Sequence, residues 1–139
     1  GKTTRFIITN TAHHDYKTKA TFTADDQTLL DNLNRTITEI TQDIEKFNLH
    51  LAAEKTYHFV WHELADRILE GSKPLLNGDN IEAKTSRERV LITYLITILK
   101  LLHPFTPYVT ETIWQELPRN WKDTDLLLIS NWPQSKTTE

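Results

Sequence analysis

Apolar residues recur at spacings of three and four along most of the chain, which is the pattern of amphipathic helices. Thr23 and Asp26 resemble a capping box with Asp in place of the usual Glu, and the apolar series that follows predicts a helix over 24–47. A second series predicts a helix over 50–71. Gly71 is expected to end this helix, and Pro74, which is unfavourable in a helix interior, prevents its continuation. The apolar positions of these two helices are Leu30, Leu33, Ile37, Ile40, Ile44 and Phe47, and then Ala53, Tyr57, Val60, Trp61, Leu64 and Ile68.

The second half of the chain predicts two further helices joined by a proline corner. Thr85 and Glu88 form another capping-box pattern, and the helix predicted over 86–103 is apolar on most sides, which indicates a central, buried position. Pro104 ends that helix, and the next is predicted over 107–117, with a proline at its first position. The apolar face of this last helix consists of Val109, Ile113, Trp114 and Leu117. These patterns predict an all-α fold, a bundle of four main helices.

The two ends of the chain have weaker patterns. Residues 6–9 are β-prone when taken alone. The apolar run 126–129 predicts either a short strand or an extended tail packed on the bundle. Residues 134–139 are predicted to be disordered, so the domain is expected to cover residues 1–133.

Composition narrows the class of protein further. At 139 residues and 16.3 kDa the chain is large enough for one domain with a core, and no apolar run approaches the roughly 20 residues of a membrane span. Cysteine is absent, which excludes disulfides and cysteine metal sites. Methionine is absent too, so we expect a fragment of a longer protein, with Gly1 as a remnant. The net charge of −3 argues against strong non-specific binding to nucleic acids but allows a local basic patch.

The sequence contains no pattern that predicts catalysis. His58 and His62 share one helix face, as a zinc pair would, but Phe59 follows where a zinc protease requires Glu, so ordinary boundary histidines are the favoured interpretation. His13 and His14 fall in a predicted loop with no partner in view. The carboxylates of the second helix are expected on a solvated face or in salt bridges: Glu63, Asp66 and Glu70. We therefore expect no catalytic residue, no metal and no cofactor in this chain.

Basic residues form two stripes that could contact phosphates. Lys55 and Lys73 lie on one stripe of the second helix. Arg89, Thr93 and Lys100 lie on one stripe of the third helix. Taken alone, such stripes are more often an ordinary solvated surface than an RNA site. Aromatic residues could stack on unpaired bases, but most lie on or beside apolar positions and are predicted to be core: Tyr57, Phe59, Trp61, Tyr94, Phe105, Tyr108 and Trp114.

The sequence of the proline corner, LLHPFTPYVTETIW over 101–114, resembles that of the anticodon-binding helical domain of class I aminoacyl-tRNA synthetases, most closely that of the valyl enzymes. The segments 57–70, 33–37 and 126–133 resemble the same family. Residues 4–10 resemble a family segment that is helical, which implies a short N-terminal helix. The motif residues, which the resemblance implies are fold-forming, are Trp61, Glu63, Asp66, His103, Pro104, Pro107 and Trp114.

The resemblance also implies a function. The chain would recognise the anticodon stem-loop of a valine tRNA, and would lack the catalytic domain, which uses ATP and Mg. Its other partners would be the catalytic and C-terminal arm portions of the parent chain. The chain is expected to be cytoplasmic and monomeric and to have no membrane partner. Candidate RNA contacts are Arg5, Lys55, Lys73, Arg89 and Lys100. Two alternatives stay open: the bundle of an isoleucyl or leucyl enzyme, and a helical protein–protein interaction domain with no RNA role.

Overall fold

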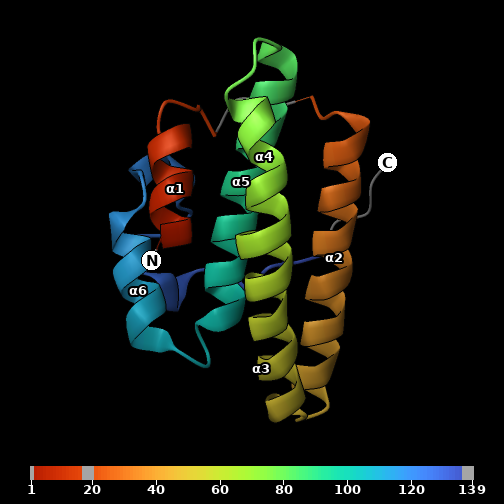
Figure 1. Cartoon of the computed structure of the whole chain (residues 1–139). Coiled ribbons are helices and arrows are strands. Elements are labelled where there is room, and N and C mark those ends of the chain that lie inside the picture. Colours follow the sequence, from red (N-terminus) through yellow and green to blue (C-terminus); the bar gives the residue numbers. More distant parts are fainter. Residues whose placement is uncertain (1, 17–20, 136–139) are drawn as a thin grey trace.

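The structure is a computed structural model that describes residues 2–16 and 21–135 (Figure 1). The prediction of an all-α fold is confirmed, and no strand occurs in these two ranges. None of the described helices is both long enough and apolar enough to cross a membrane. The elements are α1 (Lys2–Thr11), α2 (Ala24–Glu45), α3 (Leu49–His58), the π-helix η1 (Phe59–Ile68), α4 (Leu69–Leu76), α5 (Ile81–Leu102), α6 (Pro107–Glu116) and the 3₁₀ turns η2 (Arg119–Trp121) and η3 (Leu127–Ile129).

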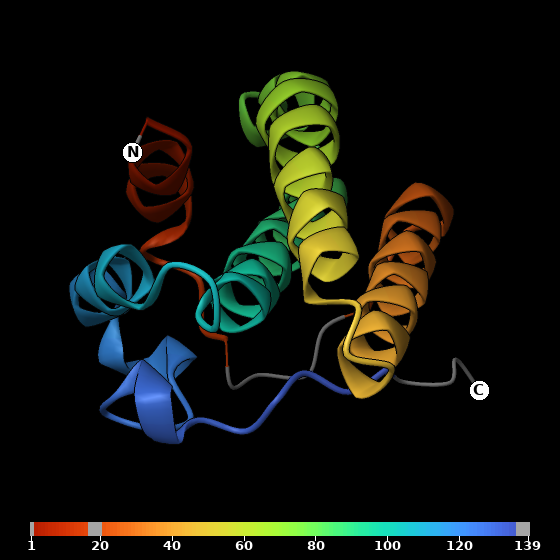
Figure 2. The same ribbon diagram turned by 90° about the horizontal axis from the view of Figure 1, so that it is seen from below.

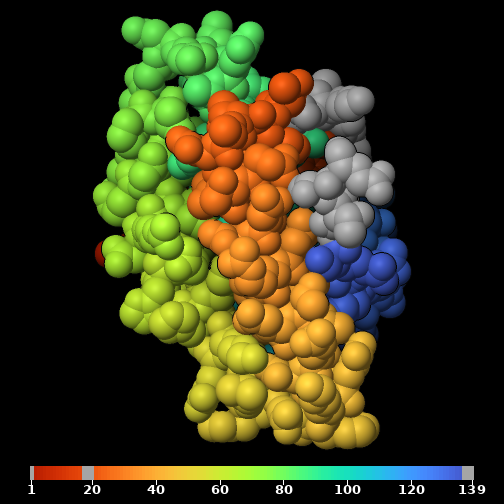
Figure 3. All heavy atoms as spheres, turned by 90° about the vertical axis from the view of Figure 1, so that its right-hand side faces the viewer, coloured from red at the N-terminus to blue at the C-terminus, as the bar shows by residue number. Residues whose placement is uncertain are grey.

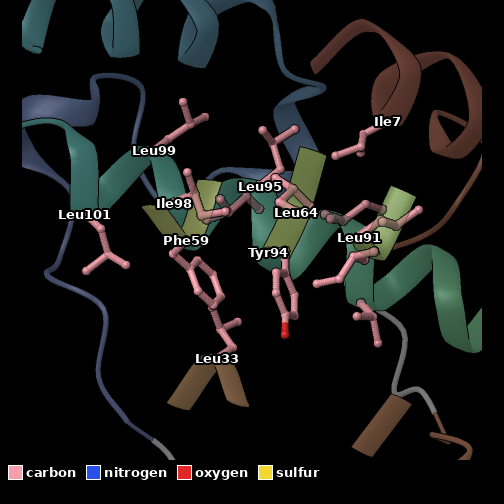
Figure 4. Packing of buried hydrophobic residues seen from close by; sticks show 14 of the residues in the cluster. Ile7, Leu33, Phe59, Leu64, Leu91, Tyr94, Leu95, Ile98, Leu99 and Leu101 are labelled. Atoms are coloured by element: carbon pink, nitrogen blue, oxygen red, sulfur yellow. The ribbon is translucent and has the colours of Figure 1, made fainter. Parts of the chain in front are cut away.

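Helix α5 lies at the centre of the bundle, as its apolar sequence predicts. In Figure 1 α3, η1 and α4 form one continuous rod in front of α5, with α2 on one side and α1 and α6 on the other. Figure 4 shows side chains from α1, α2 and η1 converging on those of α5. The Phe59 ring stacks on the Tyr94 ring at a centroid distance of 5.7 Å, and Ile7 of α1 is fully buried. The short N-terminal helix is therefore part of the core and not a β-prone stub.

The start of α2 agrees with the prediction, but its end does not. The Thr23 hydroxyl accepts a hydrogen bond from the Asp26 backbone amide at 3.2 Å, which is the predicted cap. The helix ends at Glu45, and Phe47 adopts φ 61° with 86% of its surface exposed. Phe47 is therefore a residue of the turn and not the last apolar position of the helix.

The second predicted helix extends beyond its expected end. Pro74 lies inside α4, which continues to Leu76. Pro74 has no backbone N–H, so it cannot donate to the carbonyl of Glu70 four residues earlier. The helix tolerates this loss because both residues are exposed and lie in its last two turns, where water can reach the carbonyl.

The expectation that Trp61 packs in the core is wrong, because its surface is 67% exposed. The π-helical turns of η1 are wider than those of an α-helix, so the buried face follows Phe59, Leu64 and Ile68 instead. Tyr108 and Val109 of α6 are likewise exposed, contrary to expectation.

The third predicted helix starts earlier than expected. Asn80 caps α5, and its side-chain oxygen accepts from the Ala83 amide at 3.2 Å. Thr85 and Glu88 therefore lie within the helix, and the capping box predicted for them is wrong.

The proline corner is as predicted. Helix α6 begins at Pro107, and His103 Nδ1 lies 2.9 Å from the Thr110 hydroxyl across the corner. Trp114 is fully buried, and its indole N–H donates to the Thr124 carbonyl at 3.1 Å. The first contact fixes α6 against the end of α5, and the second connects α6 to the tail.

The tail forms two 3₁₀ turns and no strand. The Glu111 carboxylate accepts from the Leu127 amide at 2.9 Å, which anchors η3 to α6. The chain then crosses the bundle to α2, where the Trp132 indole N–H donates to the Thr41 hydroxyl at 2.9 Å (Figure 2). Most of the tail predicted to be disordered, residues 136–139, lies outside the described residues.

Candidate nucleic-acid interface

A groove of about 530 Å³ lies between α2 and α5 and is bordered by the tail. Figure 3 shows the tail alongside α2 on this side of the molecule. The groove contains the stripe predicted on the third helix, with Arg89 and Lys100 in its lining. The remaining residues of the lining are Tyr16, Phe22, Gln27, Leu30, Leu33, Asn34, Ile37, Thr93, Ile96, Thr97, Pro133 and Gln134.

Arg89 is held at one end of the groove by the segment that follows α1. Its Nε atom donates to His14 Nε2 at 3.1 Å, and a terminal nitrogen donates to the Asp15 carbonyl at 3.1 Å. The guanidinium lies over the Tyr16 ring, 4.8 Å from the centroid. Tyr16 is itself 3.5 Å from the Thr93 hydroxyl. These contacts hold the guanidinium in place at the groove, where it is only half-buried.

Lys100 is the last α5 residue in the lining of the groove, and its charge is neutralised by a carboxylate. Its ammonium donates to Asp123 at 2.9 Å, and only 13% of its side chain is exposed. Burial would raise the pKa of Asp123, but the hydrogen bond and charge of Lys100, with backbone hydrogen bonds, outweigh it and hold that pKa below its ordinary value. A phosphate would have to displace this carboxylate to reach Lys100.

The rest of the lining is mixed in character. Two carboxamides from α2, Gln27 and Asn34, offer hydrogen-bond donors and acceptors. Tyr16 and Phe22 supply partly buried aromatic rings. Such a lining suits nucleotides, since cations contact phosphates, amides contact base edges and rings stack on bases.

The other candidate cations lie apart from this groove. Lys55 pairs with Asp43 at 2.7 Å in a second groove, between α2 and α3, whose lining also includes Glu39 and Glu54. Lys73 pairs with Glu70 at 2.8 Å on the exposed face of α4. Arg5 is exposed on α1. The structure therefore brings together two of the five candidates and separates the other three.

His58 and His62 do contact each other, with ring centroids 4.4 Å apart. Within residues 2–16 and 21–135, no group of three or more His, Cys, Asp or Glu is placed to hold a metal ion. On the same helix, Glu63 lies 3.4 Å from Arg67 in a salt bridge.

Sequence reasoning missed the partner of the two adjacent histidines. Glu88 is 3% exposed, and its two oxygens lie 2.6 Å from His13 Nε2 and 3.4 Å from His14 Nδ1. The capping-box pattern predicts Glu88 at the exposed start of a helix and therefore does not indicate a buried carboxylate. A helix that starts at Ile81 would have placed Glu88 on the inner face.

Comparison with known proteins gives a consistent result. Residues 26–139 match a family model described as the anticodon-binding domain of tRNA ligase. The chain is 42% identical over 110 residues to a valine–tRNA ligase of Petrotoga mobilis, covering 79% of this chain and 12% of that protein. It is 39% identical over 121 residues to the Clostridium tetani valine–tRNA ligase, covering 87% and 13%. It is 34% identical over 137 residues to the Lactobacillus johnsonii valine–tRNA ligase, covering 94% and 15%. The chain thus spans 12–15% of the length of these relatives.

Proposed function

Because the chain belongs to the family of anticodon-binding domains of tRNA ligases, we propose that it binds the anticodon stem-loop of a valine tRNA within a valine–tRNA ligase. The relatives reported above are valine–tRNA ligases, which favours valine over isoleucine or leucine. The proposal includes a cytoplasmic setting and one copy of the chain per stem-loop.

The groove between α2 and α5 is the site we propose for the loop. Arg89 and Lys100 are eleven positions apart in α5, three helical turns or about 16 Å, so they point to the same side and span several nucleotides. Gln27 and Asn34 face this interval from α2. The groove between α2 and α3 is a poorer site for a polyanion, since its lining holds two glutamates and its one lysine is paired.

The observation that carries the proposal is the presence of Arg89 in a groove of mixed lining, within a chain of the anticodon-binding family. With a net charge of −3 and few cations in the groove, binding should be weak. Contacts to two phosphates of a single strand predict a slope of about −1.4 for log affinity against log salt.

A titration of the stem-loop at several salt concentrations tests this proposal. Binding should weaken with salt near that slope, and Arg89→Ala should lower affinity for every loop sequence to a similar extent. Lys73→Ala is the matched control, because it removes an exposed cation outside the groove. Loops with altered middle and third anticodon bases should bind less tightly. Salt-independent binding, or equal effects of the two alanine variants, would rule out this groove and favour a domain that packs only on protein.

We further propose that the chain alone does not activate valine, and that ATP, Mg and valine are handled by the catalytic portion of the parent enzyme. The support is that the chain spans only 12–15% of the length of the valine–tRNA ligases it matches, and that Glu63 of η1 and Glu70 of α4 are engaged in salt bridges. Valine-dependent ATP–pyrophosphate exchange by the pure chain would contradict this.

A further inference from the structure

We propose that His14, in its neutral form, positions the Arg89 guanidinium at the groove, so that RNA binding there depends on His14 staying uncharged. The RNA part of this inference rests on the proposed function. The positioning part rests on the geometry around the ring alone and can be tested without RNA.

The hydrogen bond between the two side chains determines the tautomer of His14. Arg89 Nε always carries a proton, so at 3.1 Å it donates and His14 Nε2 must accept. The proton of the neutral ring is therefore on Nδ1, which faces a Glu88 oxygen at 3.4 Å. The ring thus connects a buried carboxylate on one side to the guanidinium on the other.

The surroundings of His14 keep the ring neutral near physiological pH. His14 is 7% exposed, and the charged or titratable groups that face it are Glu88 and Arg89 of α5 and His13 of its own segment. Burial and then the charge of Arg89 lower the pKa of His14, and they outweigh Glu88, which acts in the opposite direction. The pKa therefore lies below the 6.5 of an ordinary histidine.

Protonation of His14 would reverse the role of Nε2. Two N–H donors and two positive charges would then face each other, and Arg89 would lose this contact. The carbonyl of Asp15 and the ring of Tyr16 would still touch the guanidinium, so Arg89 would be less well placed rather than fully released. Acid should therefore weaken binding through this pair, although added histidine charge normally strengthens binding to RNA.

The tautomer can be observed directly in the unsubstituted protein. Nitrogen-15 NMR of the imidazole at about pH 7.5 should show His14 as the Nδ1–H tautomer, with Nε2 as a hydrogen-bond acceptor. An Nε2–H tautomer, or a doubly protonated ring at this pH, would overturn the inference whatever the RNA result.

Three variants separate positioning from a merely structural role. His14→Leu should lower the affinity for the stem-loop about fivefold at about pH 7.5, a loss that corresponds to the net free energy of one hydrogen bond. His14→Gln keeps an acceptor for Arg89 and should restore most of that loss. His13→Gln is the matched control, since His13 touches the same carboxylate, whereas the hydrogen bond to Arg89 Nε comes from His14.

The pH profile and a double variant complete the test. As the pH falls from about 7.5 through the pKa of His14 in the folded protein, which the same NMR experiment locates, the wild type should lose affinity relative to His14→Gln, which does not titrate. In an Arg89→Ala background, His14→Leu should have no further effect. Equal pH profiles, or full additivity of the two substitutions, would overturn the positioning role. Absence of RNA binding together with the expected tautomer would instead refute the proposed function.

Discussion

Breaking the buried ion pair between Asp26 and Arg87 should be among the most destabilising single changes in this domain. Asp26 is fully buried, and it accepts from Arg87 Nε at 2.7 Å and from the Ser86 hydroxyl at 2.5 Å. A second nitrogen of Arg87 donates to the Ser72 hydroxyl at 3.0 Å. The network therefore joins the first turn of α2 to α5 and to α4.

The magnitude follows from the desolvation of the remaining charge. Asp26→Asn leaves the Arg87 guanidinium buried without a counter-charge, which costs about 3–5 kcal/mol. For a domain of this size that corresponds to a decrease in melting temperature of roughly 10–20 °C. The free energy of unfolding from urea titration followed by circular dichroism measures the loss.

A double variant and an exposed pair serve as controls. Asp26→Leu with Arg87→Met removes both charges, so it should cost clearly less than the sum of the two single changes. Glu70→Gln breaks an exposed pair of similar length, 2.8 Å, and should cost below about 0.5 kcal/mol. If Asp26→Asn also costs below about 1 kcal/mol, or if the double variant is additive, the network does not stabilise the fold as argued.

Three further predictions concern single side chains. Trp114→Ala should cost about 3–5 kcal/mol in urea titration, because a fully buried ring leaves a cavity; a cost under about 1 kcal/mol would show that the ring is not core. Phe47→Gly should stabilise the domain by about 0.5–1 kcal/mol, because glycine has no β-carbon to clash with the backbone at the positive φ of 61°. Phe47→Ala keeps the β-carbon and should give no gain. Folding lowers the pKa of His14, so the contribution of this residue to stability is present above pH 6.5 and is lost as the pH falls below that value. Between about pH 7 and 5 the free energy of unfolding should therefore decrease less steeply in His14→Gln than in the wild type.

The parts of the fold that the sequence predicts well are those determined by local periodicity and punctuation. The apolar character of α5, the Thr23 cap and the start of α6 at Pro107 follow from residues a few positions apart. The errors occur where geometry departs from the ideal helix. A strict period of 3.6 residues places Trp61 inside, whereas the π-helical turns of η1 turn it towards solvent.

The candidate site shows a different limit, because a stripe on one helix does not reveal which partner each cation has. Lys100 contacts Asp123, and Lys55 contacts Asp43 from a neighbouring helix. Arg89 is contacted by the His14 ring, by the Asp15 carbonyl and by the Tyr16 ring. No helical pattern predicts these partners, since they come from 75, 74 and 73 positions away in the chain.

The carboxylate partners of Lys55 and Lys100 reduce what these two cations can contribute to phosphate binding. Lys55 and Lys100 must separate from a carboxylate before they can bind a phosphate, so part of the energy gained with RNA offsets the ion pair that is lost. His14, the Asp15 carbonyl and the Tyr16 ring orient the Arg89 guanidinium, which is half-buried at the groove. If Arg89 contacts the stem-loop as proposed, the hydrogen bond by which His14 orients its guanidinium makes the protonation state of His14 important for binding.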